Sequence, residues 1–130
     1  MSGQEAVFGI LTISDRASRG EYQDASGPAI LAFFEEGVIS PWKYHMEVVS
    51  DEKPLIEAAI INMVDKLGCH VVVTTGGTGP AKRDVTPEAT VSVCERILPG
   101  FGEQMRQISL QHVPTAVSYT HLTLPTISRV

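Results

Sequence analysis

Three polar segments of the chain contain residue types that can bind a phosphate group or a metal ion: residues 14–24, Asp51 and residues 75–86. The third segment combines several glycines with Arg83 and Asp84. An arginine can neutralise phosphate charge, and carboxylates are preferred ligands of Mg²⁺. Brought together, these groups would suit the transfer of a phosphoryl or nucleotidyl group.

The glycine-rich part of the third segment is the candidate phosphate-binding loop, and it consists of Thr75, Gly76, Gly77, Thr78 and Gly79. Glycines allow the backbone to turn tightly and to direct N–H groups toward an anion, while threonine hydroxyls add donors. The loop lacks the Gly-Lys-Ser/Thr ending of a P-loop and the spacing of the dinucleotide-binding motif. A plain tight turn therefore remains an alternative.

Two acids are the candidate catalytic residues and Mg²⁺ ligands, Asp51 and Asp84. Each also has a structural alternative, because Asp51 can shape a turn and Asp84 can pair with Arg83 or help to cap a helix. Ser14 and Asp15 can bind an anion, or can order their own loop. The spacing alone does not decide between these interpretations.

The elements that would position these segments follow from the alternation of β-branched runs with segments of helical period. This alternation is typical of βαβ units with a mostly parallel sheet, so the predicted fold class is α/β. Ligands of such sheets bind outside the carboxyl ends of the strands, where all three polar segments would lie. The predicted strands are residues 7–13, 42–49 and 71–73, and the last is expected to be central because its apolar run does not alternate.

Four helices are predicted from apolar periodicity and from Pro and Gly signals. The first begins near Pro28 and ends at Gly37 as a left-handed cap, and the second runs from Pro54 to Gly68. Thr86 is expected to cap a third helix that runs to about Leu98. The sequence predicts a chain break at residues 99–102, followed by a helix over residues 103–112.

The composition is that of a single globular domain of 130 residues, with a net charge of -5. No Lys- or Arg-rich stripe is present, which argues against a nucleic-acid partner. Cys69 and Cys94 lack metal-ligand spacing and are expected to be buried free thiols. Because no apolar run is long enough for a membrane helix and no leader is evident, we expect a cytoplasmic protein without a membrane partner.

Several motifs together resemble the MogA/MoaB family of molybdenum-cofactor proteins. They are Thr74-Thr75-Gly76-Gly77-Thr78-Gly79-Pro80, Arg83-Asp84-Val85-Thr86-Pro87-Glu88-Ala89 and Pro99-Gly100-Phe101-Gly102-Glu103-Gln104-Met105-Arg106. The resemblance extends over about residues 6–117. It implies a three-layer α/β/α fold and an adenylyltransferase reaction, in which Mg²⁺-ATP and molybdopterin give adenylyl-molybdopterin and pyrophosphate.

The resemblance also implies roles for the candidate residues. Asp51 and Asp84 would be the essential acids near Mg²⁺ and ATP, and residues 75–79 would hold phosphate. Ser14 and Asp15 would line the same pocket, and Arg83 would contact phosphate. The family further implies a homotrimer that hands its product to a molybdenum-inserting partner.

The resemblance ends after Val117, where the family continues with another strand, a loop and a final helix. We therefore expect residues 1–117 to form a domain that lacks its last strand and helix, and residues 118–130 to be a non-native tail that resembles translated adapter sequence. An apolar strand edge left open in this way would compromise activity. The alternative to an enzyme is a non-catalytic, MoaB-like module that binds molybdopterin or serves as a scaffold.

Overall fold

The computed structural model describes residues 5–112 and 122–124, and its main element is a parallel sheet. Strands β1 (Ala6–Ile13), β2 (Trp42–Val49) and β3 (Val71–Thr75) lie in the order β2-β1-β3. At the carboxyl end of the sheet, Ile13 is paired with Val49 and Thr12 with Thr75. The loops that follow all three strands therefore begin at the same edge, as the sequence predicts.

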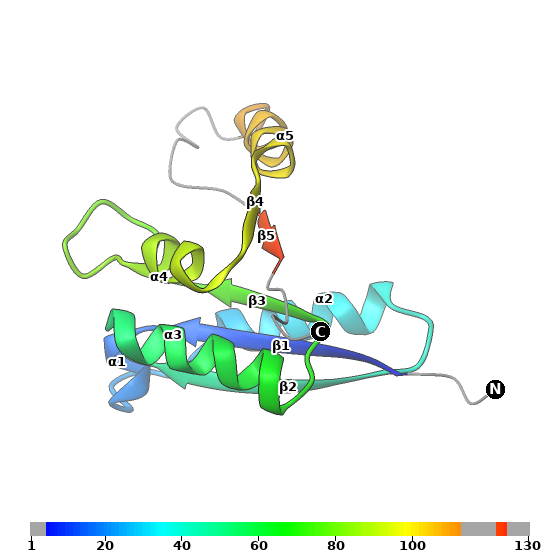
Figure 1. Ribbon diagram of the computed structural model, residues 1–130, viewed down its shortest axis with the longest axis horizontal. Coiled ribbons are helices and arrows are strands. Elements are labelled where there is room, and N and C mark those ends of the chain that lie inside the picture. The colour runs from blue at the N-terminus through cyan, green and yellow to red at the C-terminus, as the bar shows by residue number, and fades with distance from the viewer. Residues whose placement is uncertain (1–4, 113–121, 125–130) are drawn as a thin grey trace.

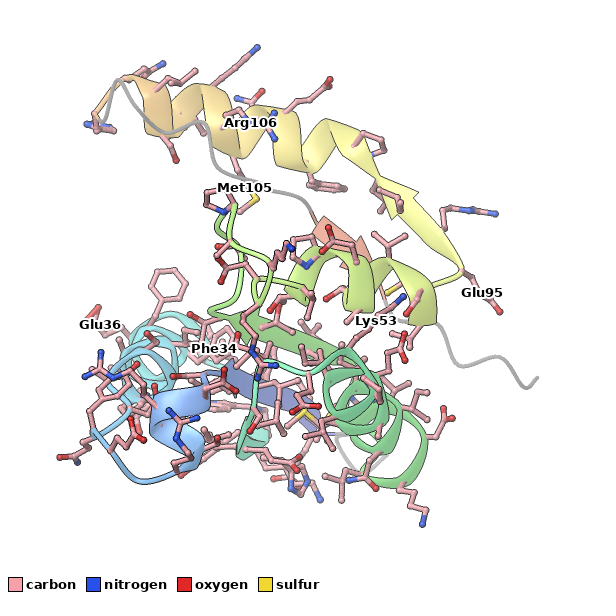
Figure 2. The ribbon with its side chains drawn as sticks, turned by 90° about the vertical axis from the view of Figure 1, so that its left-hand side faces the viewer. Phe34, Glu36, Lys53, Glu95, Met105 and Arg106 are labelled. Atoms are coloured by element: carbon pink, nitrogen blue, oxygen red, sulfur yellow. The ribbon has the colours of Figure 1, made fainter. Side chains whose placement is uncertain are left out.

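Helices cover both faces of this sheet, which gives the predicted three layers. Helix α2 (Ser26–Gly37) lies on one face, and α3 (Lys53–Ile61) lies on the other (Figures 1 and 2). Helix α3 continues as a π-helical turn, η1 (Asn62–Lys66), and α4 (Thr86–Val93) packs beside it. A short helix, α1 (Asp15–Ser18), follows β1 directly.

Alternate residues of β1 supply the two cores. Leu11 is fully buried in one cluster with Ile56 and Met63 of the α3 layer. On the opposite face, Phe8 stacks on Phe34 of α2 at a ring separation of 4.5 Å. Because consecutive side chains of a strand point to opposite faces, one central strand serves both layers.

The predicted order of the strands is wrong in one respect, because β1 and not β3 is central. Residues of β3 are half-buried throughout, whereas β1 is buried along most of its length. An unalternating apolar run indicates contact on both faces, but it does not specify the neighbouring strands. On the other edge strand, the alternating apolar side chains of Tyr44, Met46 and Val48 are 45%, 38% and 38% exposed.

The two predicted glycine caps have different outcomes. Gly68 has a φ of 70° and follows the second helix, as predicted. Gly37 is the last residue of α2 and has no positive φ, so its prediction as a left-handed cap is wrong. The extended backbone of Val38 ends that helix instead.

The predictions for the third and fourth helices also need correction. Helix α4 ends at Val93, because Cys94 is extended, and does not reach Leu98. Thr86 is already helical and its side chain caps no N–H group. The predicted break at residues 99–102 forms the first turn of α5 (Pro99–Leu110), where proline is tolerated because the first helical N–H groups have no partner within the helix.

The segment after α4 forms what we call the C-terminal arm, which consists of β4 (Arg96–Leu98), α5 and β5 (Leu122–Leu124). Strands β4 and β5 pair antiparallel, and Figure 1 shows the arm projecting from the sheet. The remaining elements, from β1 to α4, are the sheet body. The predicted domain boundary after Val117 and most of the predicted tail lie outside the described residues.

The cysteines and helices of the described residues bear on two further predictions. Both cysteines are free thiols, with Cys69 buried and Cys94 half-buried. Burial raises the pKa of the Cys69 thiol, which keeps it protonated and unreactive. Within the described part of the chain, no helix is both long and apolar enough to cross a membrane.

Candidate functional site

The loops after β1 and β2 are joined by reciprocal hydrogen bonds between Asp15 and Asp51, two of the predicted site residues. The backbone N–H of Asp15 donates to Asp51 Oδ2 at 2.8 Å, and the N–H of Asp51 donates to Asp15 Oδ1 at 3.0 Å. Each carboxylate is thus held by the first residues of the other loop. The structure brings together two segments that are 36 positions apart in the chain.

Arg83 connects the third polar segment to this pair. Its guanidinium donates to both carboxylate oxygens of Asp15, over distances of 2.7 to 3.0 Å, and lies 3.9 Å from a carboxylate oxygen of Glu52. Hydrogen bonds from Arg83 hold the pKa of Asp15 below its ordinary value of 3.8, and those bonds raise the pKa of Arg83. Arg83, the predicted phosphate contact, is therefore bound to Asp15 of the same site.

The glycine loop after β3 has a conformation that requires glycine at two consecutive positions. Gly76 and Gly77 have φ values of 92° and 67°. A Cβ atom on Gly76 would lie 2.2 Å from the carbonyl oxygen of Ile13. A Cβ atom on Gly77 would lie 2.2 Å from Thr86 Oγ1 and 3.0 Å from Asp51 Oδ1. The loop is packed tightly against the end of β1 and against Asp51 and Thr86, which a longer side chain would prevent.

Asp84 lies at the far end of the same loop and shapes it. Its Oδ2 accepts a hydrogen bond from the N–H of Ala81 at 3.1 Å, and a Cβ on Gly79 would lie 2.8 Å from the same oxygen. The predicted alternative of a pair between Asp84 and Arg83 is not found, because Arg83 binds Asp15. Asp51 thus approaches the glycine loop at Gly77, and Asp84 approaches it at Gly79.

The hydroxyl groups predicted for the site differ in how accessible they are to a ligand. Ser14 Oγ accepts a hydrogen bond from the N–H of Ala17 at 3.2 Å and so caps α1. Thr75 is the last residue of β3 and is half-buried, whereas Thr78 is exposed in the loop. Of the three, Thr78 is therefore the hydroxyl most open to a ligand, and the structure supports the loop-ordering alternative for Ser14.

The sequence did not predict a polar cluster beneath the first loop. Thr12 Oγ1, in a side chain that is 4% exposed, donates to Asp24 Oδ2 at 2.9 Å. The other oxygen of Asp24 accepts from the N–H groups of Ser26 and Gly27 at the start of α2. An acidic residue just before a helix that begins with Ser-Gly-Pro is a signal that could have indicated this role.

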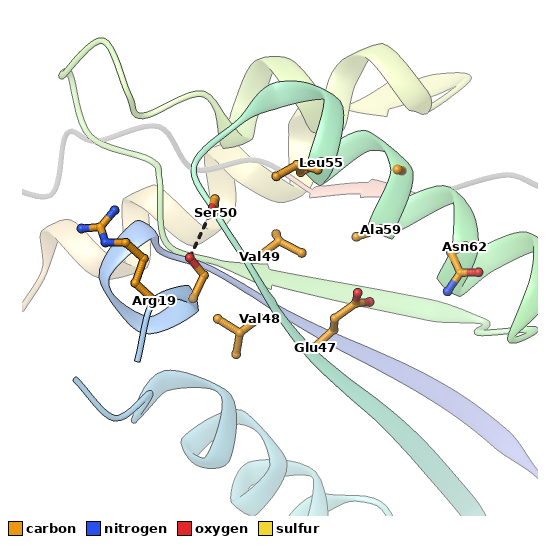
Figure 3. A pocket seen from close by; sticks show the side chains of 10 residues that line it. Arg19, Glu47, Val48, Val49, Ser50, Leu55, Ala59 and Asn62 are labelled. Carbon is orange, nitrogen blue, oxygen red and sulfur yellow. Dashed lines mark hydrogen bonds between the residues drawn. The ribbon is translucent and has the colours of Figure 1, made fainter. Parts of the chain in front are cut away.

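An open pocket of about 520 Å³ adjoins the site along the edge of β2 (Figure 3). Its lining includes the apolar side chains of Val49 and Leu55 and the polar side chains of Arg19 and Asn62. Ser18 and Ser50 share a hydrogen bond of 2.9 Å at one end, drawn as the dashed line in Figure 3. Because Ser50 directly precedes Asp51, the pocket ends beside the two joined acids. Its volume falls in the range of small-molecule sites.

Metal binding by this site would need help from a ligand. Among the described residues, no group of three or more His, Cys, Asp or Glu side chains is arranged to hold a metal ion. Two carboxylates, Asp51 and Asp84, could therefore contribute only together with phosphate oxygens and water, which is the usual coordination of Mg²⁺. Their oxygen chemistry fits that ion.

Parallel strands, helices on both faces and polar loops at the carboxyl edge define an α/β ligand-binding domain. Residues 9–127 match the family described as "Probable molybdopterin binding domain", and the chain belongs to that family. The resemblance predicted from the sequence motifs is thus confirmed.

Known relatives make this placement more specific. The chain is 56% identical over 114 residues to a molybdopterin adenylyltransferase of Helicobacter pylori strain J99, covering 88% of this chain and 65% of the relative. It is 51% identical over 110 residues to the molybdopterin adenylyltransferase of Escherichia coli K12, covering 85% and 56%. The chain therefore spans less than two thirds of these relatives.

A solved structure supports the fold. The tungsten cofactor synthesizing protein MoaB from Pyrococcus furiosus superposes with a TM-score of 0.76 at 34% identity. The match covers 90% of this chain and 71% of that one. The predicted MogA/MoaB-like architecture is thereby confirmed.

Proposed function

We propose that this chain carries the site of a molybdopterin adenylyltransferase, which transfers AMP from ATP to molybdopterin. The observation that carries the proposal is the glycine loop of residues 76–79, which carboxylate oxygens of Asp51 and Asp84 approach at Gly77 and Gly79. This arrangement occurs in a chain that is 51% to 56% identical to curated molybdopterin adenylyltransferases. The loop offers donors for phosphate, and the acids offer ligands for a cation that accompanies it.

In this reaction the terminal phosphate of molybdopterin attacks the α-phosphorus of ATP. The new bond joins a phosphate oxygen to that phosphorus, and the bond to the β-phosphate breaks and releases pyrophosphate. The chain supplies no nucleophile, so its contribution is to position the two phosphates and to stabilise charge. Bound Mg²⁺ would neutralise part of the negative charge on the phosphate oxygens.

The residues of the site would divide this work. The N–H groups of the glycine loop and the exposed Thr78 hydroxyl would bind phosphate oxygens. Asp51 and Asp84 would hold the cation, since each approaches the loop with a carboxylate. Arg83 would exchange one of its bonds to Asp15 for a bond to a phosphate oxygen, because its side chain is 58% exposed.

The resemblance supports further parts of the proposal. ATP and molybdopterin are the substrates, Mg²⁺ is the cofactor, and the working assembly is a homotrimer in the cytoplasm. The product would pass to a molybdenum-inserting partner. Residues 1–117 would form the domain, and residues 118–130 would take no part in the reaction.

Transfer of label from α-labelled ATP to molybdopterin in the presence of Mg²⁺ tests this proposal. The assay uses the 130-residue chain and a chimera in which it is joined to the part of the Escherichia coli relative that it does not cover. Asp84→Asn in the active background should reduce transfer on the order of a hundredfold or more. Glu36→Gln, an exposed change of the same type on α2, is the matched control.

Two results would contradict the proposal. A folded chimera that binds molybdopterin without transferring AMP would support the non-catalytic binding module instead. Full activity of the Asp84→Asn variant would remove that acid from the mechanism, because an amide cannot replace the charge of a carboxylate.

A further inference from the structure

Thr86 has a side chain whose hydroxyl is buried and unused. The residue is 2% exposed. Among the buried side-chain nitrogen and oxygen atoms of the described residues, Thr86 Oγ1 is the one without a hydrogen-bond partner. A buried hydroxyl without a partner costs free energy, because its bonds to water are lost and not replaced. Such an atom needs an explanation.

The ordinary structural roles of this threonine do not use the hydroxyl. Its backbone N–H donates to the carbonyl of Gly77 at 3.1 Å, which holds the glycine loop to the start of α4. Its carbonyl accepts a bond from Thr90 Oγ1 at 2.7 Å. No side chain caps the start of α4, so the Thr86 hydroxyl does not serve as a helix cap either. A valine of the same shape would provide the same packing.

A carboxylate oxygen of the proposed site lies close to this hydroxyl. Thr86 Oγ1 and Asp51 Oδ1 approach the same point, since they lie 2.2 Å and 3.0 Å from where a Cβ of Gly77 would stand. The two oxygens are therefore within about 5 Å of each other. The second oxygen of Asp51 already accepts a bond from Asp15. A hydrogen bond between them would require the two oxygens to approach to about 2.8 Å.

We infer that Thr86 is a positioning residue for Asp51: when a phosphate ligand occupies the glycine loop, Thr86 Oγ1 donates a hydrogen bond to Asp51 Oδ1. This inference rests on the proposed function, because it presumes a phosphate ligand in that loop. A ligand that draws in the loop N–H groups shifts Gly77, which in the free protein lies against both oxygens. The hydroxyl then fixes the orientation of the carboxylate that would hold the cation.

Three variants in the full chain test this role. Thr86→Val removes the hydroxyl and keeps the shape, Thr86→Ser restores a hydroxyl, and Thr90→Val removes a satisfied hydroxyl one turn further along α4. Thermal unfolding without ligand is measured first. Thr86→Val should be no less stable than the parent, whereas Thr90→Val should be less stable because it loses an existing bond.

Calorimetric titration with Mg²⁺-ATP is the second measurement. Thr86→Val should bind about tenfold more weakly, the size expected for one hydrogen bond to a charged group. Thr86→Ser should return to within about threefold of the parent, and Thr90→Val should bind as the parent does. Equal affinity for Thr86→Val, or a failure of serine to restore binding, would overturn the inference.

The same titration separates this inference from the proposed function. If Mg²⁺-ATP binds and depends on the Thr86 hydroxyl but AMP is never transferred, the positioning role stands and the proposed activity fails. If AMP is transferred at the parent rate by Thr86→Val, the activity stands and the positioning role fails. A parent chain that neither binds nor transfers contradicts both.

Discussion

Helix α3 of the sheet body buries its apolar face, whereas helix α5 of the C-terminal arm leaves its large apolar side chains exposed. In the body, Ile56 and Met63 have no exposed surface. In the arm, Gly102 is the one buried residue of α5. The large apolar side chains of α5 remain between 39% and 56% exposed, and they are Phe101, Met105, Ile108 and Leu110.

This difference shows what an apolar pattern can and cannot predict. The pattern of α5 predicts a helix with one apolar face, and a helix forms. Burial of that face needs a partner surface, and most helix stability in proteins comes from such packing. Figure 2 shows Met105 on the side of α5 nearest the body, yet the side chain remains 48% exposed. We expect the same substitutions to have unequal effects in the two regions.

The largest difference is expected for a matched pair of methionines. Met63→Ala in the body creates a cavity and should lower the free energy of unfolding by about 3 kcal/mol. Met105→Ala in the arm should change it by less than about 0.5 kcal/mol. Urea denaturation of both variants measures these values. Equal losses would show that α5 is packed as firmly as the body.

A matched pair of glycines should give effects of opposite sign. Gly77→Ala places a Cβ 2.2 Å from Thr86 Oγ1 at a positive φ, so it should destabilise the protein by about 2 kcal/mol. Gly100→Ala in α5 meets no atom within 4 Å and should stabilise by up to about 0.5 kcal/mol. Thermal unfolding gives both values. A tolerated Gly77→Ala would mean that the loop relaxes freely.

Acidic residues near two helix starts give an intermediate effect. Asp24 accepts hydrogen bonds from N–H groups at the beginning of α2. Asp24→Ala should therefore lower the free energy of unfolding by about 1 kcal/mol. Glu103→Ala changes an exposed acid in the first turns of α5 and should cost less than about 0.5 kcal/mol. Denaturant titrations of the two variants are compared at neutral pH. A larger loss for Glu103→Ala would indicate a contact that holds the arm.

The smallest effect is expected for an exposed ion pair within the sheet body. Arg83 lowers the pKa of Asp15, so their interaction stabilises the folded protein above the ordinary carboxyl value of 3.8 and is lost as pH falls through the lowered one. Arg83→Met should therefore lower the melting temperature slightly at pH 7 and not at pH 2. Lys82→Met, which removes the same charge next to it, is the control. A deficit that persists in acid would assign the effect to packing.

Much of the fold was predictable because its signals are local. The three parallel strands, the helix from Pro54 to Gly68 and the glycine loop each follow from periodicity or from residues with restricted conformations. The order of the strands was not predictable, because it depends on which strands pair with each other across the sheet. The end of α4 was also missed, because the apolar residues that continue after Val93 form β4 and not a further helical turn.

The site was predictable in outline for a geometric reason. The carboxyl ends of parallel strands lie at one edge, so residues after the strands had to meet. The partner of Arg83 and the unused hydroxyl of Thr86 could not be predicted, because both depend on side-chain orientations across separate loops. Sequence spacing says which residues can meet, and packing decides which atoms do.

The reciprocal bonds between Asp15 and Asp51 have a consequence for ligand affinity. Each carboxylate is anchored to a main-chain N–H of the other loop, so neither side chain is free to sample many rotamers. The entropy of ordering these acids is lost when the chain folds. A ligand that arrives later meets a preorganised surface, and more of its interaction energy can appear as affinity.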